Sequence, residues 1–220
     1  MLKKLLIPYA YRNKIRLGPN RDGGYVVAGN LIQVERLLSL GCSNQTGFEE
    51  DFLKHNKRKN FECKIYDLQG SCDLASKEEN VFFIKERVDN LENVIEHKLP
   101  TVIQMDIEGS EFDCLSSYEG FFSNVWQMII EFHFYPHVTK NKNIKEIFDK
   151  INKYFYLIHM HGNNHKKLTE EGIPQVLECT YVNKNLFSEE PEKETSAFPV
   201  DGLDFPNTHT LPEMILDWWV

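Results

Sequence analysis

Seven short apolar runs recur along the chain and predict seven β-strands. Several of them, such as residues 101–105 and 125–130, are almost continuously apolar instead of alternating with polar positions. This pattern is typical of strands that helices cover on both faces, because neither side of such a strand meets water. The predicted strands are Arg36–Gly41, Glu62–Asp67, Asn80–Ile84, Thr101–Asp106, Trp126–Phe132, Tyr154–Met160 and Gln175–Val182.

Segments with a helical pattern lie between these runs. The last of them carries apolar residues at positions 144, 147, 148 and 151, which fall on one face of a helix. The predicted helices are Phe48–Asn56, Asp89–His97, Glu111–Phe122 and Ile144–Tyr154. Strands that alternate with helices predict an α/β fold with a doubly wound, mostly parallel sheet.

Both ends of the chain depart from this alternation, so we divide it into residues 1–30, 31–187 and 188–220. The first part contains a turn at Arg21–Gly24 that runs into an apolar stretch, which predicts a short strand or hairpin. In the last part, Ser188–Ser196 is charged and expected to be mobile, and Pro199–Pro212 is expected to wrap the surface. The final Ile215–Val220 is too apolar to be left exposed, so we expect it to dock on the domain or on a second copy of the chain.

Composition narrows the class of protein. The chain has 220 residues with 25 basic and 33 acidic side chains, a net charge of −8, which argues against nonspecific nucleic-acid binding. No run of about 18 apolar residues occurs, so no membrane span is expected. Five cysteines at irregular intervals predict neither a disulfide framework nor a structural zinc site. We expect a reduced, cytoplasmic location.

Polar residues gather where the predicted strands end, and ligands of open α/β sheets bind at that edge. The first strand runs into Gly41, Cys42 and Ser43, small residues that let a ligand approach the backbone, although an ordinary strand–helix turn explains them equally well. Asp67 ends the second strand, where a carboxylate can accept hydrogen bonds from both ribose hydroxyls of a nucleoside cofactor.

The fourth and fifth strands end in ionisable side chains. Asp106, Glu108 and Glu111 crowd the end of the fourth strand; we expect Ser110 or Glu108 to cap the next helix and Asp106 to face the ligand cleft. Crowded carboxylates can raise one another's pKa or hold a divalent cation. On the fifth strand, Glu131 and His133 share a face, which predicts His133 beside Asp106 as a general base.

The sixth strand ends in His159-Met160-His161-Gly162-Asn163-Asn164-His165. His159 and His161 share a face, as metal ligands on a strand would, but the spacing offers no fixed third ligand. Recognition of a polar substrate, or a hydrogen-bonded turn, is therefore the favoured interpretation of this motif.

In this order, the motifs resemble those of the FkbM-type methyltransferases. The resemblance runs from about residue 22 to 186 and rests on Asp22-Gly23-Gly24-Tyr25, Asp106-Ile107-Glu108-Gly109-x-Glu111, Ile130-Glu131-x-His133, His161-x-Asn163-Asn164 and Glu178-Cys179-Thr180-Tyr181-Val182. It implies a class I, Rossmann-like sheet of seven strands, the last antiparallel, with S-adenosylmethionine as the methyl donor. The chain departs from the family at Ser43, where a second Gly or Ala is common.

The resemblance also implies roles for individual residues. Gly41, Cys42 and Ser43 would line the methionine portion of the cofactor, Asp67 would hold the ribose, Leu68 and Gln69 would flank the adenosine, and Arg87 and Val88 would meet the adenine. Asp106 would stand near the transferable methyl group. We assign Asp22, Tyr25, Glu108, His161, Asn163 and Asn164 to the acceptor.

The implied reaction is methylation of a hydroxyl group on a sugar, a glycan or a related small molecule. His133, or Asp106 acting with a divalent cation, would be the base. Two alternatives stay open at this point. The strand-end Gly41 and Asp67 also fit an NAD-dependent oxidoreductase, and a degenerate methyltransferase fold could serve as a binding module that uses the tryptophan-containing tail as its contact surface.

Overall fold

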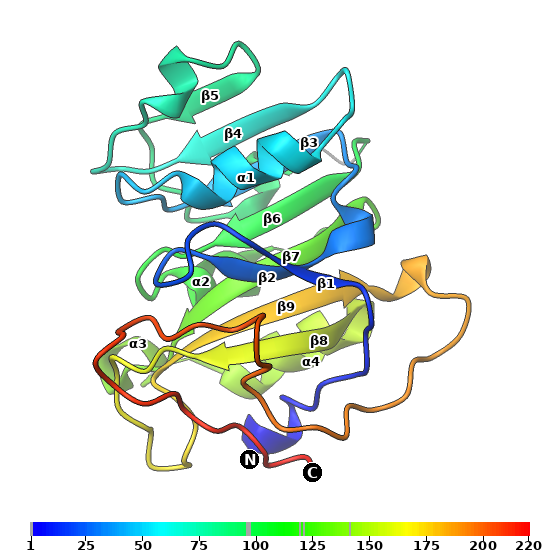
Figure 1. Cartoon of the computed structure of the whole chain (residues 1–220), viewed down its shortest axis with the longest axis vertical. Coiled ribbons are helices and arrows are strands. Elements are labelled where there is room, and N and C mark those ends of the chain that lie inside the picture. Colours follow the sequence, from blue (N-terminus) through cyan, green and yellow to red (C-terminus); the bar gives the residue numbers. More distant parts are fainter. Residues whose placement is uncertain (1, 96–97, 119, 121, 141) are drawn as a thin grey trace.

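A computed structural model describes residues 2–95, 98–118, 120, 122–140 and 142–220. Seven strands form one sheet in the order β5-β4-β3-β6-β7-β9-β8, and β9 runs antiparallel to both of its neighbours (Figure 1). Their bounds are β3 Arg36–Leu40, β4 Glu62–Tyr66, β5 Val81–Ile84, β6 Thr101–Met105, β7 Val125–His133, β8 Phe155–Gly162 and β9 Val176–Asn183. All seven predicted strands are present, each within two residues of its expected ends. The predicted α/β class and the antiparallel last strand are thereby confirmed.

The remaining elements are a hairpin and short helices. β1 Lys14–Leu17 and β2 Tyr25–Ala28 pair antiparallel outside the main sheet, as the N-terminal pattern predicted. The α-helices are α1 Gly47–His55, α2 Glu111–Ser117, α3 Pro136–Thr139 and α4 Ile144–Tyr154. The 3-10 helices are η1 Leu2–Lys4, η2 Gly29–Leu31, η3 Leu74–Ser76, η4 Leu91–Asn93 and η5 Lys184–Leu186.

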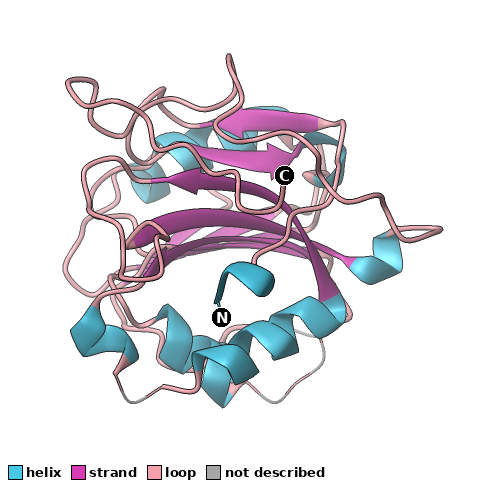
Figure 2. Ribbon diagram, turned by 90° about the horizontal axis from the view of Figure 1, so that it is seen from below, coloured by secondary structure: helices cyan, strands magenta, loops and turns pink. Residues whose placement is uncertain are grey.

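The sheet lies between two covering layers (Figure 2). Helices α2 and α4 cover one face, while α1, the hairpin and much of the C-terminal chain lie over the other (Figures 1 and 2). Side chains of the sheet hold the hairpin in place: the side-chain oxygen of Gln127 accepts from the Ala28 amide at 3.0 Å, and the Thr180 hydroxyl donates to the Val26 carbonyl. Tyr25 is thereby fixed above the carboxyl end of the strands.

Two predicted helices are shorter in the structure. Within the described part of Asp89–His97 the chain forms only the 3-10 turn η4, which is enough to bury Leu91, Val94 and Ile95; residues 96 and 97 lie outside the described residues. The helix predicted over Glu111–Phe122 ends at Ser117. Tyr118 is extended there, and its ring packs against that of Phe122 with 4.5 Å between the ring centroids. Residues 119 and 121 again lie outside the described residues.

The C-terminal chain docks on its own domain. Phe198 and Leu216 are buried and pair through two backbone hydrogen bonds of 2.9 Å, and the Trp218 indole donates to the Leu6 carbonyl at 3.0 Å. Part of the apolar Ile215–Val220 thus docks on its own domain, while Ile215 and Val220 themselves are exposed, and the contact with a second chain stays a prediction. Within the part of the chain that the structure describes, every helix is too short or too polar to cross a lipid bilayer.

Candidate active site

The turn after β3 requires glycine at its first position. Gly41 has a φ of +86°, and a Cβ atom there would stand 1.8 Å from the backbone oxygen of Asp106. Ser43 and Asn44 follow with φ values of 45° and 68°, in the left-handed region that favours glycine. Position 43 of this chain therefore carries serine although its backbone conformation favours glycine.

Asp67 ties this turn to the turn after β4 through backbone amides. Its Oδ2 accepts from the amides of Cys42 at 3.0 Å and Ser43 at 2.9 Å, and its Oδ1 accepts from those of Gln69 at 2.8 Å and Gly70. Partial burial raises the pKa of Asp67, but the four donors outweigh it and lower the pKa to about 2. The ionised carboxylate thus fixes two loops, and these donors already occupy the roughly four acceptor positions that a carboxylate offers.

Two adjoining cavities open at this edge of the sheet. One, of 260 Å³, contains Asp67 and the residues expected around adenosine, namely Leu68, Gln69, Arg87 and Val88. The other, of 230 Å³, contains Asp22, Tyr25 and Cys42. Both are lined by Gly41, Ser43, Asp106 and Glu108, so these four residues stand where the cavities meet. Together the cavities fall within the range of small-molecule sites, roughly 300–1,000 Å³.

Asp106 lies where the two cavities meet, and its two carboxylate oxygens have different surroundings. The Tyr25 hydroxyl donates to Asp106 Oδ2 at 3.1 Å, whereas Oδ1 is buried and finds no hydrogen-bond partner among the described residues. Burial raises the pKa of Asp106 to about 7. A buried acceptor without a donor is a place where a ligand group or an ion would be stabilised.

His133 is held at the same junction by Glu111. The His133 Nδ1 lies 3.0 Å from Oε1 of Glu111, a fully buried carboxylate that also accepts from the amides of Ile107 and Gly109. Because two backbone amides already donate to Glu111 Oε1, this oxygen acts as an acceptor and Nδ1 supplies the proton of the contact. Nε2 is then the atom that faces the carboxylates of Glu108 at 3.4 Å and Glu131 at 3.7 Å. Burial lowers the pKa of His133, but the Glu111 bond outweighs it and the net pKa is raised.

These contacts confirm one prediction and correct another. His133 does lie beside Asp106, as the parity of the strand positions predicted: ligand atoms of Asp106, Glu108 and His133 all lie within 4.8 Å of one another. The expected helix cap is wrong, because Ser110 makes no side-chain cap bond and Glu108 lies outside the helix with a φ of 54°. Glu111 instead folds back onto the loop, where it orients His133.

The histidine and asparagine motif after β8 lies away from the two cavities. His161 Nδ1 contacts Glu178 at 3.1 Å, and the Asn163 side chain accepts from the amide of His165. Asn164 donates to the carbonyls of Thr208, Leu211 and Pro212, so its role in the structure is to hold the C-terminal chain. His159 contacts Asp204 at 2.8 Å and is engaged in the same way.

Two buried carboxylates escaped the sequence reasoning as parts of the site. Glu131 was recognised only as a neighbour of His133, and Glu178 only as part of a motif. The strand register places Glu131 directly opposite Glu178, and Glu178 opposite His161. Burial raises the pKa of Glu131 well above its usual range. The sequence alone predicts which residues of one strand share a face. It does not give the register between neighbouring strands, which brings Glu131, Glu178 and His161 together.

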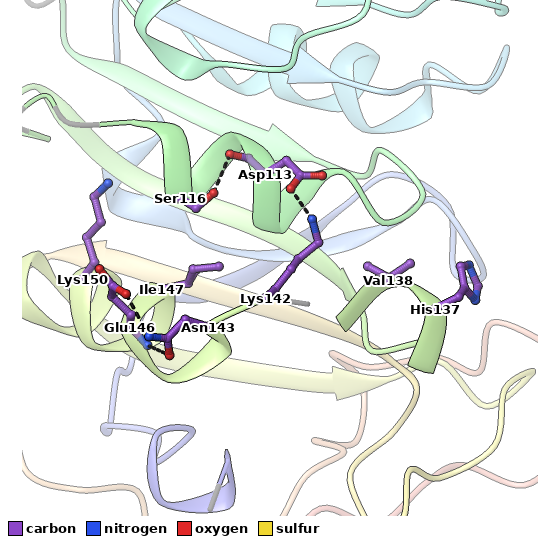
Figure 3. A pocket seen from close by; sticks show the side chains of 9 residues that line it. All are labelled: Asp113, Ser116, His137, Val138, Lys142, Asn143, Glu146, Ile147 and Lys150. Atoms are coloured by element: carbon purple, nitrogen blue, oxygen red, sulfur yellow. Dashed lines mark hydrogen bonds and ion pairs between the residues drawn. The ribbon is translucent and has the colours of Figure 1, made fainter. Parts of the chain in front are cut away.

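A further hollow, of 440 Å³, lies on the helical face between α2, α3 and α4 (Figure 3). Its polar side chains already pair with one another or with the backbone: Lys142 with Asp113, Asn143 with the amide of Glu146, and Lys150 with the Leu115 carbonyl. It lies away from the strand ends, and we assign no function to it.

Comparison with known proteins decides the family. A family model described as the methyltransferase FkbM domain matches residues 15–162, more than half of the chain. The chain belongs to the FkbM methyltransferase family. This membership makes S-adenosylmethionine the cofactor to be fitted, and it favours a methyltransferase over the NAD-dependent alternative. The position that only glycine can occupy and the joined cavities fit such a cofactor. Asp67 holds the two turns together, and its carboxylate is occupied by backbone amides instead of being free for ribose hydroxyls.

Solved structures show a more distant likeness. A protein assigned as an rRNA methylase from Clostridium thermocellum shares 12% identity, with 68% of this chain and 86% of that chain covered and a TM-score of 0.43. A protein assigned as an S-adenosylmethionine-dependent methyltransferase from Listeria monocytogenes shares 11%, with 70% and 91% covered and a TM-score of 0.43. CmcI, in a structure with Mg and S-adenosylmethionine, shares 14%, with 67% and 65% covered and a TM-score of 0.41. A search of curated protein sequences gave no significant match.

Proposed function

We propose that this FkbM-family protein transfers the methyl group of S-adenosylmethionine to a hydroxyl oxygen of a sugar, a glycan or a related small molecule. The observation that carries the proposal is the Glu111–His133 pair, which holds the His133 ring beside Asp106 and Glu108, two residues that line both cavities. The cofactor supplies a methyl group already activated on a sulfonium, so the protein needs mainly to align the reactants and to accept one proton.

The two cavities are proposed to bind different reactants. The cavity with Asp67, Leu68 and Arg87 is proposed to take the adenosine, and the cavity with Asp22 and Tyr25 to take the acceptor, with Asp106 near the methyl group. When bound, the cofactor would supply a methyl group that moves from its sulfonium sulfur, which would keep the electron pair, to the hydroxyl oxygen of the acceptor. The hydroxyl proton passes to His133 Nε2, and Glu111 stabilises the imidazolium that results.

A divalent cation at the same junction is the second candidate. The atoms of Asp106, Glu108 and His133 that lie within 4.8 Å of one another could ligate it. Glu111 on the other ring nitrogen is the arrangement that commonly orients a metal-bound histidine. His133 Nε2 cannot serve as a ligand and as a free base at once, so the two mechanisms are exclusive.

A methyl-transfer assay tests the proposal. Radiolabelled S-adenosylmethionine would be incubated with the protein and a panel of neutral sugars, glycans and nucleotide-sugars. His133→Ala should lower turnover by about 10²- to 10⁴-fold and leave the affinity for S-adenosylhomocysteine unchanged. The exposed His137 in α3 provides the matched control, since His137→Ala should retain full activity. Equal turnover of His133→Ala and wild type would remove His133 from the mechanism.

Chelation separates the two mechanisms. If His133 is a free base, EDTA leaves turnover unchanged and Glu108→Gln, at an exposed side chain, has only a modest effect. If a cation is bound, EDTA abolishes turnover, Mg²⁺ or Mn²⁺ restores it, and Glu108→Gln raises the concentration of metal that is needed. A protein that binds S-adenosylhomocysteine and methylates no compound would favour the binding-module alternative.

We also propose a cytoplasmic location. All five cysteines lie in the described part of the chain and are free thiols, which supports a reducing compartment. Fractionation of the source cells with an antibody against the protein would test this, and recovery from an oxidising compartment would contradict it.

A further inference from the structure

The C-terminal segment, defined as residues 196–220, lies outside the stretch that the FkbM family model matches. Phe198 and Leu216 pair through their backbones and close this segment into a loop. Between these two residues the segment extends along the end of β8 and the start of β9 (Figure 1). Its course is fixed there by buried polar contacts: Asp204 with His159 at 2.8 Å, and Glu213 with His161 at 3.1 Å. The segment is therefore an integral wall of this edge of the molecule.

A row of ionisable side chains runs from the catalytic junction to this wall. On neighbouring strands Glu131 lies opposite Glu178, and Glu178 lies opposite His161. His161 then links Glu178, through Nδ1, to Glu213 of the C-terminal segment, through Nε2. The row begins beside His133 and leads away from Asp67. The cavity around Asp67 is proposed to take the adenosine, so the row leads toward the side proposed for the acceptor.

Asn207 of the C-terminal segment connects the row to the acceptor cavity. Its side-chain nitrogen donates to Glu178 Oε1 at 2.9 Å and to Asp22 Oδ1 at 3.0 Å. Asp22 lines the cavity that also contains Tyr25 and Asp106. One neutral amide thus bridges two carboxylates that would otherwise repel each other.

A second contact reinforces the same connection. Phe205, two residues before Asn207, lies under the guanidinium of Arg16, 5.5 Å from its ring centroid. Arg16 in turn donates to the carbonyls of Pro19 and Arg21, which precede Asp22. The C-terminal segment therefore contacts the Asp22 loop at two places. Asn207 donates to the Asp22 side chain, and Phe205 packs against Arg16, which binds the backbone of the loop.

Four buried acceptor atoms at this edge have no hydrogen-bond partner among the described residues: Glu49 Oε2, Asp106 Oδ1, Glu111 Oε2 and Asn207 Oδ1. Buried acceptors of this kind are normally satisfied by water or by a ligand. Three acidic side chains, Asp22, Glu49 and Asp106, line the acceptor cavity and give it a wall that is rich in acceptors. Such a wall suits a ligand with several donor hydroxyls and disfavours one with a phosphate at the methylated end.

We propose that Asn207 is a positioning residue of the acceptor site, which holds Asp22 and Glu178 in the geometry that recognises a neutral polyhydroxyl acceptor. The inference rests on the proposed methyltransferase function for its substrate, but its structural part is independent of it. The C-terminal segment, which lies outside the stretch matched by the family model, thereby contributes to the side of the site proposed for the acceptor.

Variants at Asn207 test this with a matched control. Asn207→Ala removes the bridge, and Asn207→Asp places a third carboxylate between the two. The control substitutions Asn185→Ala and Asn185→Asp lie at an exposed asparagine in the turn after β9, at the other end of that strand. We expect both Asn207 variants to raise the KM for the neutral acceptor found in the methyl-transfer assay about tenfold or more, with Asp the larger effect. The affinity for S-adenosylhomocysteine should stay within about twofold of wild type.

Hydrogen exchange separates positioning from a general loss of structure. In Asn207→Ala the amides of residues 20–25 should exchange faster, about tenfold, while those of residues 214–219 keep their wild-type rates. Faster exchange throughout residues 196–220 would mean that the segment has undocked, and it would contradict a local positioning role. Unchanged exchange at residues 20–25 would overturn the inference, as would an unchanged KM.

The two proposals fail in different ways. If the wild-type protein neither binds S-adenosylhomocysteine nor transfers a methyl group, the proposed function is wrong, and the exchange experiment still decides whether Asn207 positions Asp22. If the wild type methylates only acceptors with a phosphate beside the reacting hydroxyl, the function stands and the neutral-acceptor inference is overturned.

Discussion

The two sides of this site, one proposed for the cofactor and the other for the acceptor, are built by different means. On the cofactor side, Asp67 accepts four backbone N–H groups from two loops that lie within 30 residues of each other. On the acceptor side, side chains converge from the N-terminal loop, three strands and the C-terminal segment, as Asp22, Glu131, Glu178 and Asn207 illustrate.

This difference bears on how each side tolerates substitution. A site made of backbone groups needs few particular side chains beyond glycine at tight positions, so it can be kept while the rest of the sequence changes. A site made of distant side chains depends on register and on docking of the tail, and it can be altered one residue at a time. The predictions that follow test whether the two sides respond to mutation in these two ways.

The largest effect is expected at Gly41. In Gly41→Ala the new Cβ would meet the Asp106 backbone oxygen, and the φ of +86° is unfavourable for any other residue. We expect a loss of about 3 kcal/mol or more in the free energy of unfolding, measured by urea denaturation, and loss of S-adenosylhomocysteine binding.

Gly202 provides the control for this substitution. Its φ is +73°, but within the described chain no heavy atom lies within 4 Å of the position that a Cβ would take. Gly202→Ala should therefore cost only about 1 kcal/mol. Equal costs for the two alanine variants would contradict the close approach of Gly41 to Asp106.

The next effect is expected at Asp67. Asp67→Ala removes the acceptor of four amides, and we expect the affinity for S-adenosylhomocysteine to fall by about 10- to 100-fold in calorimetry, since both loops lose their common anchor. Asp73→Ala, at an exposed aspartate in the same stretch of chain, should bind as the wild type does. Undiminished affinity of Asp67→Ala would exclude both the ribose role and the loop role of this carboxylate.

A smaller effect, on the pH dependence of stability, is expected at His161 on the acceptor side. Burial lowers the pKa of His161, but Glu178 and Glu213 raise it to about 10, compared with 6.5 for an unperturbed histidine. Its contribution to stability is therefore complete below pH 6.5 and is lost as the pH rises through 10. We expect the Tm of the wild type to fall by about 5 °C more between pH 7 and 10 than that of His161→Asn. The exposed His209 serves as control, because His209→Asn should retain the wild-type slope, and parallel slopes for all three proteins would contradict the buried ion pairs.

The smallest effect is expected at Ser43. Its φ of 45° is costly for serine and free for glycine, so Ser43→Gly should raise the free energy of unfolding by up to about 1 kcal/mol. Binding of S-adenosylhomocysteine should not weaken, because the side chain at this position is not the group that Asp67 holds. A destabilised Ser43→Gly protein would mean that the serine side chain stabilises the turn.

The sequence predicted the cofactor side better than the acceptor side, for a physical reason. Continuous apolar runs mark buried strands wherever they lie, and the residues that follow them mark the ligand edge, so Gly41, Asp67 and Asp106 could be found from local pattern. Parity within one strand also placed His133 correctly. The contact between Glu111 and His133 was not predicted, because nothing local shows that a glutamate at the start of a helix turns back to the next strand.

The contacts that could not be predicted join residues far apart in the chain. Asn207 meets Asp22 across 185 positions, and Glu213 meets His161 across 52. The docking of Ile215–Val220 was expected from its apolar character, but the same character fits a partner chain as well as the domain itself. Only the folded arrangement shows that the segment reaches the acceptor cavity.

The central claim is that S-adenosylmethionine binds where the turns of Gly41 and Asp67 meet. The most direct test is a calorimetric titration of the full-length protein with S-adenosylhomocysteine. We expect saturable binding with one site per chain, and no comparable binding of NADH. A titration that shows no saturable binding of S-adenosylhomocysteine would contradict the claim.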